Sequence, residues 1–197
     1  MEKVVIVGAG NPGKLILDII FKRRYMLLEE IHVLGFLDEN LTLQGELIHG
    51  TEVIGTLASF LSKVTDSDLQ FIIAEEDLKY RKEVIKAIEA KGYFDFYTAI
   101  HPRAVVGNNV VVGTGTIVHS GAIVSMDTEI GEHVIIGAGC MIEIGTCIED
   151  YVTIKPKVIV GEDVYIGENT MLRAGTIVND RKRIPCDYTS KLGEIIE

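Results

Sequence analysis

A six-residue repeat dominates the C-terminal half of the chain. Every sixth residue from Ile100 to Val178 is valine, isoleucine or leucine, without a break. The residue two places before each of these is small or β-branched, as at Ala104, Thr116 and Cys140. Side chains two residues apart on a strand share a face, so both series point inward if a turn resets the phase in each repeat. The repeat therefore predicts short strands and corners that stack as a solenoid and bury one another's aliphatic side chains.

Glycine directly follows the aliphatic residue in several repeats, at Gly107, Gly113, Gly131, Gly137, Gly161 and Gly167. Glycine adopts backbone conformations that other residues avoid. We therefore expect the corner of the repeat to use the conformational freedom of glycine at this position.

The N-terminal half alternates strand and helix patterns. Short apolar runs predict strands at residues 3–7, 31–37 and 70–74, and helices are expected after the segment "GAGNPG", around 57–61 and over 77–92. This order predicts a small parallel α/β unit, about half of a dinucleotide-binding fold. Because only one mononucleotide half is present, a nicotinamide-dependent enzyme is disfavoured.

Composition excludes several classes of partner. A formal net charge of -10 opposes attraction to nucleic acid or to an anionic membrane surface. No apolar run approaches the roughly 20 residues of a membrane helix, and the start of the chain does not resemble a secretion signal, so we expect a cytoplasmic protein. Cys140, Cys147 and Cys186 lack the spacing of a metal site, so we expect reduced thiols and no metal.

The hexads over residues 100–178 resemble those of the hexapeptide-repeat acyltransferases. The segments "VIVGAGNPGK", "GFLDEN", "VIGTLASFL" and "AIHPRAVVG" resemble a subgroup, the sialic-acid O-acetyltransferases and bacillosamine-type sugar-nucleotide N-acetyltransferases. The resemblance implies a Rossmann-like α/β domain at 1–98, followed at 99–197 by a left-handed parallel β-helix with a C-terminal tail. It also implies a homotrimer that binds acetyl-CoA along the β-helix and a nucleotide sugar, with uridine rather than NAD, in the N-terminal domain.

Five residues of the N-terminal half are candidates for binding the nucleotide sugar. Gly8, Gly10, Asn11 and Gly13 lie where a strand passes into a helix, and backbone N–H groups and the helix dipole can bind phosphate there. Asp38 follows the second strand, where a carboxylate can accept hydrogen bonds from ribose or base. The alternatives are a merely tight turn for the glycines and a turn or capping carboxylate for Asp38.

Acetyl transfer needs a base for the attacking group and donors for the oxyanion. In the subgroup that this chain resembles, a histidine and an acidic partner supply the base, and the corresponding segment here is "MIEIGTCIEDY". Glu143 is retained, but Ile144 stands where the histidine is expected and Gly145 where its partner is expected. A second family histidine falls at Thr153, and "RKRIPCDYTSKLGEIIE" replaces the C-terminal "GxPA" segment of the family.

Three other side chains remain as candidate bases: His119, His133 and Glu143. His119 follows His101 by three hexads, which make one coil of the expected β-helix, and His133 shares its column with Tyr151. For both histidines a solvated or structural role is the alternative. Glu143 is the weaker candidate because an unshifted carboxylate is a poor base.

Three cations are candidates for binding coenzyme A. Lys155 and Arg173 share a column and Lys157 is close by, so they can pair with the phosphates of the coenzyme. The alternative is an exposed charge pair offset by Glu162 and Asp163. The leading hypothesis is an enzyme that acetylates a nucleotide-linked amino sugar or a sialic-acid-type sugar without the usual histidine. The competing hypothesis is a catalytically silent relative that binds a nucleotide sugar or acts as a scaffold.

Overall fold

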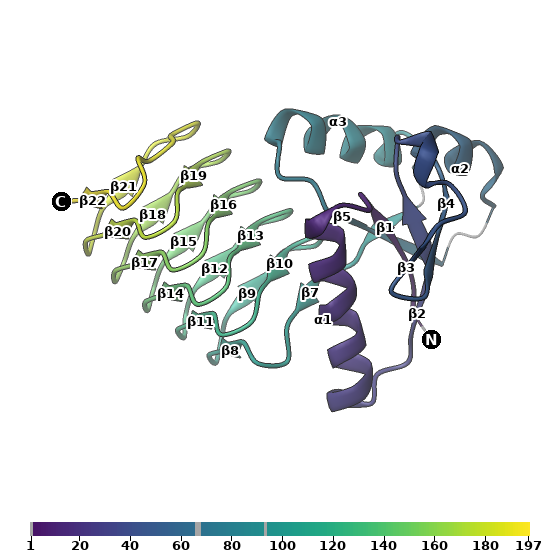
Figure 1. Cartoon of the computed structure of the whole chain (residues 1–197). Coiled ribbons are helices and arrows are strands. Elements are labelled where there is room, and N and C mark those ends of the chain that lie inside the picture. Colours follow the sequence, from purple (N-terminus) through teal and green to yellow (C-terminus); the bar gives the residue numbers. More distant parts are fainter. Residues whose placement is uncertain (1, 66–67, 93) are drawn as a thin grey trace. The chain divides into compact units, whose positions relative to one another are not determined.

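The computed structural model describes residues 2–65, 68–92 and 94–197. The chain divides into two compact units, residues 1–97 and 98–197. Figure 1 shows three α-helices around a sheet in the N-terminal unit and rows of short stacked strands in the C-terminal unit.

The N-terminal unit contains a six-stranded sheet in the order β3-β4-β2-β1-β5-β6. The pairs are parallel except for the antiparallel pair β3–β4. The strands are β1 Glu2–Val7, β2 Ile31–Leu37, β3 Leu47–Ile48, β4 Thr51–Gly55, β5 Leu69–Ile73 and β6 Asp95–Phe96. The helices are α1 Asn11–Leu27, α2 Leu57–Lys63 and α3 Leu78–Glu89, with a short 3₁₀ helix, η1, at Leu41–Leu43.

The three predicted strands and three predicted helices of this unit are confirmed to within a few residues at their ends. Strand β1 is central, and Val4, Val5 and Ile6 are fully buried, as expected for a parallel strand covered on both faces. Strands β3, β4 and β6 were not predicted from the sequence. Strands β3 and β6 have two residues each, too few to show a periodicity, and β3 and β4 form a hairpin at the edge of the sheet.

The C-terminal unit is a left-handed parallel β-helix with three sheets. Within a sheet each strand pairs with the strand one coil later, as Ile117 pairs with Ile135. The first β-helix sheet consists of β7 Ala99–Ile100, β10 Ile117–Val118, β13 Ile135–Ile136, β16 Thr153–Ile154 and β19 Met171–Leu172. The second consists of β8 Val105–Val106, β11 Ile123–Val124, β14 Met141–Ile142, β17 Ile159–Val160, β20 Ile177–Val178 and β22 Ile195–Ile196. The third consists of β9 Val111–Val112, β12 Glu129–Ile130, β15 Cys147–Ile148, β18 Tyr165–Ile166 and β21 Arg183–Ile184.

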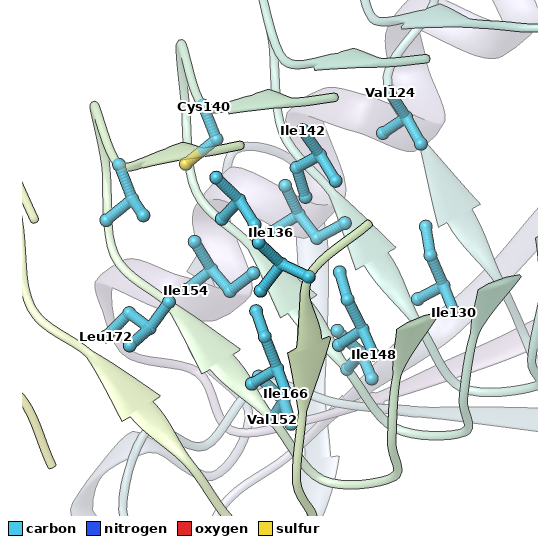
Figure 2. Close-up of a cluster of buried hydrophobic side chains, with 14 of the residues drawn as sticks. Val124, Ile130, Ile136, Cys140, Ile142, Ile148, Val152, Ile154, Ile166 and Leu172 are labelled. Atoms are coloured by element: carbon cyan, nitrogen blue, oxygen red, sulfur yellow. The ribbon is translucent and has the colours of Figure 1, made fainter. Parts of the chain in front are cut away.

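The interior of the β-helix is a continuous column of the predicted inward side chains. The aliphatic residues of the hexads are buried from Val118 to Val178, and Figure 2 shows many of them in contact across the coils. Val106, in the first coil, is 38% exposed because few residues cover it on one side. Inward threonines keep their hydroxyls satisfied: Thr116 Oγ1 donates to the Gly131 carbonyl at 2.8 Å, and Thr146 Oγ1 donates to the Gly161 carbonyl at 3.1 Å.

The expected reason for the repeated glycines was wrong. Left-handed backbone occurs three residues after the inward aliphatic residue, at every sixth position from Asn109 to Gly193. The glycines one place after the aliphatic residue serve close stacking of coils instead. A Cβ at Gly137, for example, would lie 2.6 Å from the backbone nitrogen of Pro156 in the next coil.

The segment expected to be a C-terminal tail adds a further coil. Strand β21 pairs with β18, Thr189 bridges to Met171, and β22 pairs with β20. Ser190 takes the inward position where the repeat has an aliphatic residue, and it is buried. Its Oγ accepts the Arg173 N–H at 2.8 Å and lies 2.8 Å from Thr176 Oγ1, so a polar residue is tolerated there.

Candidate functional site

A pocket of about 290 Å³ lies at the carboxyl ends of β1, β2 and β5. Strand β1 lies between the other two, and the chain runs from β1 to β2 on one side and later returns to β5 on the other. Ligands of open α/β sheets bind at such a switch in strand order. The pocket is lined by Val7, Gly8, Leu37, Asp38, Glu39, Ile73, Glu75, Tyr80 and Val84.

The glycine-rich turn supports both the pocket and the start of α1. Gly8 lines the pocket with φ +104°, and a Cβ there would lie 2.8 Å from the Ala74 carbonyl oxygen. A Cβ at Gly13 would collide with the Gly8 carbonyl, so Gly13 allows α1 to pack closely against the end of β1. Gly10 is the N-cap of α1 without a side-chain cap, and Asn11 is exposed at its first position. Gly10, Asn11 and Gly13 do not line the pocket, but they leave the first amides of α1 without a capping side chain.

Asp38 closes the loop at the end of β2. Its Oδ2 accepts the Ala9 N–H at 2.8 Å, and its Oδ1 accepts the Asn40 N–H at 2.9 Å. These contacts are those of the turn carboxylate weighed as an alternative. Each carboxylate oxygen can accept more than one hydrogen bond, so Asp38 can also face a ligand in the pocket that it lines.

Three polar residues of this pocket were not predicted from the sequence: Glu39, Glu75 and Tyr80. Burial raises the pKa of the Tyr80 hydroxyl, and the negative charges of Glu39, Glu75 and Asp38 raise it further. Asp38 and these two glutamates line the same pocket as Tyr80. The signal in the sequence was the segment "EED", which follows the third predicted strand directly and so lies at the same edge of the sheet as Gly8 and Asp38.

The three corners of the β-helix differ in charge, and residues 98–197 are all described. The basic corner, between the first and second β-helix sheets, comprises residues 101–104, 119–122, 137–140, 155–158, 173–176 and 191–194. It carries one acidic residue, Glu194, beside the cations Arg103, Lys155, Lys157, Arg173 and Lys191. The first acidic corner comprises residues 107–110, 125–128, 143–146, 161–164 and 179–182, and the second comprises 113–116, 131–134, 149–152, 167–170 and 185–188.

The structure brings the three predicted coenzyme-binding cations together on the basic corner. Lys157 has φ +61°, whereas Gly139 and Gly175 occupy the same left-handed position in the adjacent coils. Lys191 joins these cations on the basic corner and was missed because it lies in the segment taken for a tail. The alternative interpretation was an exposed charge pair whose positive charge is offset by Glu162 and Asp163. These two residues lie on the first acidic corner instead.

The three candidate bases lie on three different corners. His119 lies on the basic corner and is half-buried. His133 lies on the second acidic corner, is 3% exposed and stacks on Tyr151 with ring centroids 5.4 Å apart, as their shared column predicted. Glu143 lies on the first acidic corner next to Ile144, which is 37% exposed. Within one chain, His119 is therefore the candidate that shares a corner with the cations.

The cysteines are free thiols in separate surroundings. Cys140 is buried, and burial raises the pKa of its thiol. Burial also raises the pKa of the Cys147 thiol, with Glu149 and Glu129 adding to the effect, whereas Cys186 is exposed. In the described part of the chain no three His, Cys, Asp or Glu side chains are grouped as metal ligands, and no helix has the length and apolar character needed to cross a membrane.

Comparisons with known proteins agree with this architecture. Residues 3–88 match the PglD N-terminal domain. The chain is 31% identical over 118 residues to UDP-N-acetylbacillosamine N-acetyltransferase of Bacillus subtilis (strain 168), a match that covers 59% of this chain and 51% of the relative. It is 28% identical over 130 residues to GDP-perosamine N-acetyltransferase of Escherichia coli O157:H7, covering 64% of this chain and 55% of the relative. The matches thus span about half the length of these curated relatives.

Two solved structures share the fold over nearly the whole chain. One is a histidine-to-asparagine mutant of perosamine N-acetyltransferase from Caulobacter crescentus in complex with CoA and GDP-perosamine, with a TM-score of 0.84, 23% identity, and coverage of 99% of this chain and 88% of that one. The other is the acetyltransferase domain of PglB from Neisseria gonorrhoeae FA1090 in complex with acetyl coenzyme A, with a TM-score of 0.71, 24% identity and 95% coverage of both chains. With a match to the PglD N-terminal domain over residues 3–88, followed by a left-handed β-helix, the chain is similar to the hexapeptide-repeat sugar acetyltransferases.

Proposed function

We propose that the chain transfers an acetyl group from acetyl-CoA to an amino sugar carried on a nucleotide. The observation that carries this proposal is the pairing of a pocket at the switch point of a PglD-type domain with a β-helix that concentrates its cations on one corner. The first unit has the form of a nucleotide site, and the second has a surface suited to an anionic coenzyme.

The nucleotide sugar occupies the N-terminal unit in this proposal. The first amides of α1, beyond Gly8 and Gly10, face the diphosphate, since helix N-termini attract anions and this one has no acidic residue in its first turn. The acidic pocket beside it would repel phosphate, so the uncharged nucleoside enters the pocket. Asp38 holds the glycine-rich turn beside the pocket by accepting a hydrogen bond from the Ala9 N–H.

Coenzyme A occupies the basic corner in this proposal. Lys155, Lys157, Arg173 and Lys191 supply positive charge for its phosphates on a protein whose net charge is -10. In four coils the left-handed position of this corner is glycine, so no side chain covers the backbone there. These residues are Gly121, Gly139, Gly175 and Gly193. The cations and the uncovered backbone together support binding of coenzyme A along this corner, with its phosphates beside the cations.

In the proposed reaction the sugar amine attacks the thioester carbonyl of acetyl-CoA. The new C–N bond forms, the C–S bond breaks, the amine gives up a proton, and the coenzyme leaves as a thiol once its sulfur is protonated. We assign His119 as the base because it is the candidate on the basic corner and is half-buried rather than enclosed. The enclosed, stacked ring of His133 supports a structural role for that residue instead.

A catalytically silent protein is the second candidate function, and one observation favours it. Ile144 presents a partly exposed aliphatic side chain at the position where the family resemblance implies a histidine, and an aliphatic group cannot accept a proton. Such a protein would bind the nucleotide sugar without turnover.

We propose that the chain forms a homotrimer through an apolar stripe on the second β-helix sheet. Each strand of that sheet contributes one outward residue, 36% to 60% exposed, and the stripe consists of Val105, Ile123, Met141, Ile159, Ile177 and Ile195. A continuous apolar stripe of this kind is typical of an association surface. Of the other aliphatic residues expected to be exposed, Val111 is exposed and Ile135 is partly covered. Light scattering tests this: Ile159→Glu should reduce the trimer to monomers, and a wild-type monomer refutes the proposal.

Thiol release from acetyl-CoA tests the proposed function. The purified chain is mixed with acetyl-CoA and a panel of GDP-linked and UDP-linked amino sugars, and calorimetry measures binding of CoA separately. Sugar-dependent thiol release supports the transferase. Binding of both ligands without release with any sugar supports the silent protein, and Ile144→His should then restore measurable release. Failure to bind CoA refutes the transferase, and failure to bind either ligand refutes both candidates.

A further inference from the structure

The switch-point pocket has an unusual balance of hydrogen-bonding groups. Asp38, Glu39 and Glu75 supply three carboxylates, Tyr80 adds a hydroxyl, and the other side chains that line the pocket are aliphatic. None of the described residues that line the pocket is lysine, arginine or histidine. Ionised carboxylates only accept hydrogen bonds, so the group that fills this pocket has to present N–H or O–H donors and carry no negative charge.

The nucleobases differ in how well they meet this demand. Guanine presents two neighbouring donors, the ring N1–H and the exocyclic N2–H, which match the two oxygens of one carboxylate. Uracil and thymine present a single imide N–H between two carbonyl oxygens, and those oxygens would face the carboxylates without a donor. Adenine and cytosine place a ring nitrogen acceptor beside their amino group. A buried polar edge that meets no partner weakens binding strongly, so the pocket discriminates between bases.

Two of the carboxylates are held in place by backbone donors. Glu75 Oε1 accepts the Asp77 N–H at 2.8 Å, and Glu39 Oε1 accepts the Leu57 N–H at 3.2 Å. Both contacts leave capacity on the same carboxylate for a ligand. Glu75 is half-buried, whereas Glu39 is exposed at the rim, so Glu75 is the deeper acceptor. Asp77 caps α3 by accepting the Tyr80 N–H at 2.8 Å, which fixes the segment that carries both Glu75 and Tyr80.

We propose that this pocket selects guanine, with the N1–H and N2–H of the base donating to Glu75 and the ribose hydroxyls donating to Glu39. The inference rests on the proposed function only in placing a nucleotide sugar at this site. It differs from the uridine nucleotide that the sequence resemblance implies. The curated relatives include one UDP-sugar enzyme and one GDP-sugar enzyme, so the pocket's own chemistry decides between the two bases.

Isothermal titration of the full chain with GDP, UDP and inosine diphosphate tests this inference. GDP should bind at least about tenfold more tightly than UDP, as expected for hydrogen bonds to a charged acceptor. Inosine diphosphate lacks the N2 amino group and should bind about tenfold more weakly than GDP by the same reasoning. This comparison uses the unmodified protein, so it does not depend on whether a variant folds.

Glu75→Gln supplies the protein side of the test. It should weaken GDP binding about tenfold and leave UDP binding within about threefold, because the amide replaces one acceptor by a donor. Glu76→Gln is the matched control: it removes the same charge at the next position, which is exposed and outside the pocket, and should leave the GDP to UDP ratio unchanged.

The possible results separate this inference from the proposed function. Equal or tighter binding of UDP, inosine diphosphate binding as well as GDP, or no nucleotide binding overturns the inference. Acetyl transfer to UDP-linked sugars alone overturns it while the proposed function stands. Selective GDP binding without acetyl transfer supports the inference while the proposed function fails.

Discussion

Lys157→Gly should stabilise the protein and weaken coenzyme binding at the same time. Lys157 has φ +61°, and the equivalent positions one coil before and after it are Gly139 and Gly175. Left-handed backbone costs a residue with a side chain about 1–2 kcal/mol, and glycine avoids that cost. The greater freedom of glycine in the unfolded chain returns about 0.4–1 kcal/mol. The net gain is about 1 kcal/mol, equivalent to a rise in Tm of about 2–4 °C for a chain of this size.

The same substitution removes one of the cations assigned to the coenzyme phosphates. An exposed ion pair contributes at most about 1 kcal/mol, which corresponds to roughly fivefold weaker binding of CoA. The loss should shrink at high salt, because exposed charges are screened. Differential scanning fluorimetry measures the Tm, and calorimetry at two salt concentrations measures CoA binding.

Arg181→Gly is the matched control. Arg181 also carries a positive charge with φ +60°, but it lies on the first acidic corner, where its Nε is 4.0 Å from Asp163 Oδ2. It should raise the Tm by a similar amount and leave CoA binding unchanged. A fall in Tm for Lys157→Gly refutes the backbone reasoning. The assignment of the coenzyme to the basic corner is refuted if both variants lose the same CoA affinity, or if neither variant loses any.

Four further substitutions test other parts of the structure. Gly13→Ala should destabilise the N-terminal unit by about 2 kcal/mol and abolish nucleotide binding, because the added methyl group would collide with the Gly8 carbonyl. Chemical unfolding and nucleotide titration measure the two effects, and an unfolding midpoint equal to that of the wild type contradicts this packing. Ile154→Ala should cost about 2–5 kcal/mol in the same unfolding assay, since the side chain is fully buried among the coils, and a loss below about 1 kcal/mol contradicts the tight column. His119→Asn should lower kcat about 100-fold or more in the thiol assay with the Tm unchanged, whereas His133→Asn should lower the Tm; the reverse pattern exchanges the two roles.

The β-helix could be predicted from the sequence because its repeat is local and nearly uniform. Each coil buries the same kind of side chain, so the period of six and the pairing of each strand with the strand three hexads later follow from aliphatic positions and the family resemblance. The aliphatic series continues at Ile184, six residues after Val178, but Ser190 then interrupts it, and the last coil was missed. The burial of Ser190 depends on hydrogen bonds to Thr176 and Arg173 in the preceding coil, and a search for aliphatic residues does not find such a partner.

The site could be predicted only in part. Gly8 was found from the glycine spacing after the first strand, and Asp38 from its place directly after the second strand. Glu75 and Tyr80 line the same pocket, but they become neighbours of Asp38 only when β5 is placed beside β1. Lys155 and Arg173 could be placed in one column from their spacing of one coil, whereas Lys191 was missed because its coil was taken for a tail.

Mass spectrometry of the nucleotide sugar gives the most direct measurement of the central claim. The purified chain is incubated with isotopically labelled acetyl-CoA and a GDP-linked amino sugar, and both products are quantified. The account predicts one labelled acetyl group on the sugar for each molecule of free coenzyme A, with much less product when the sugar is linked to UDP. An unmodified sugar, with acetyl-CoA consumed no faster than in buffer, would contradict it.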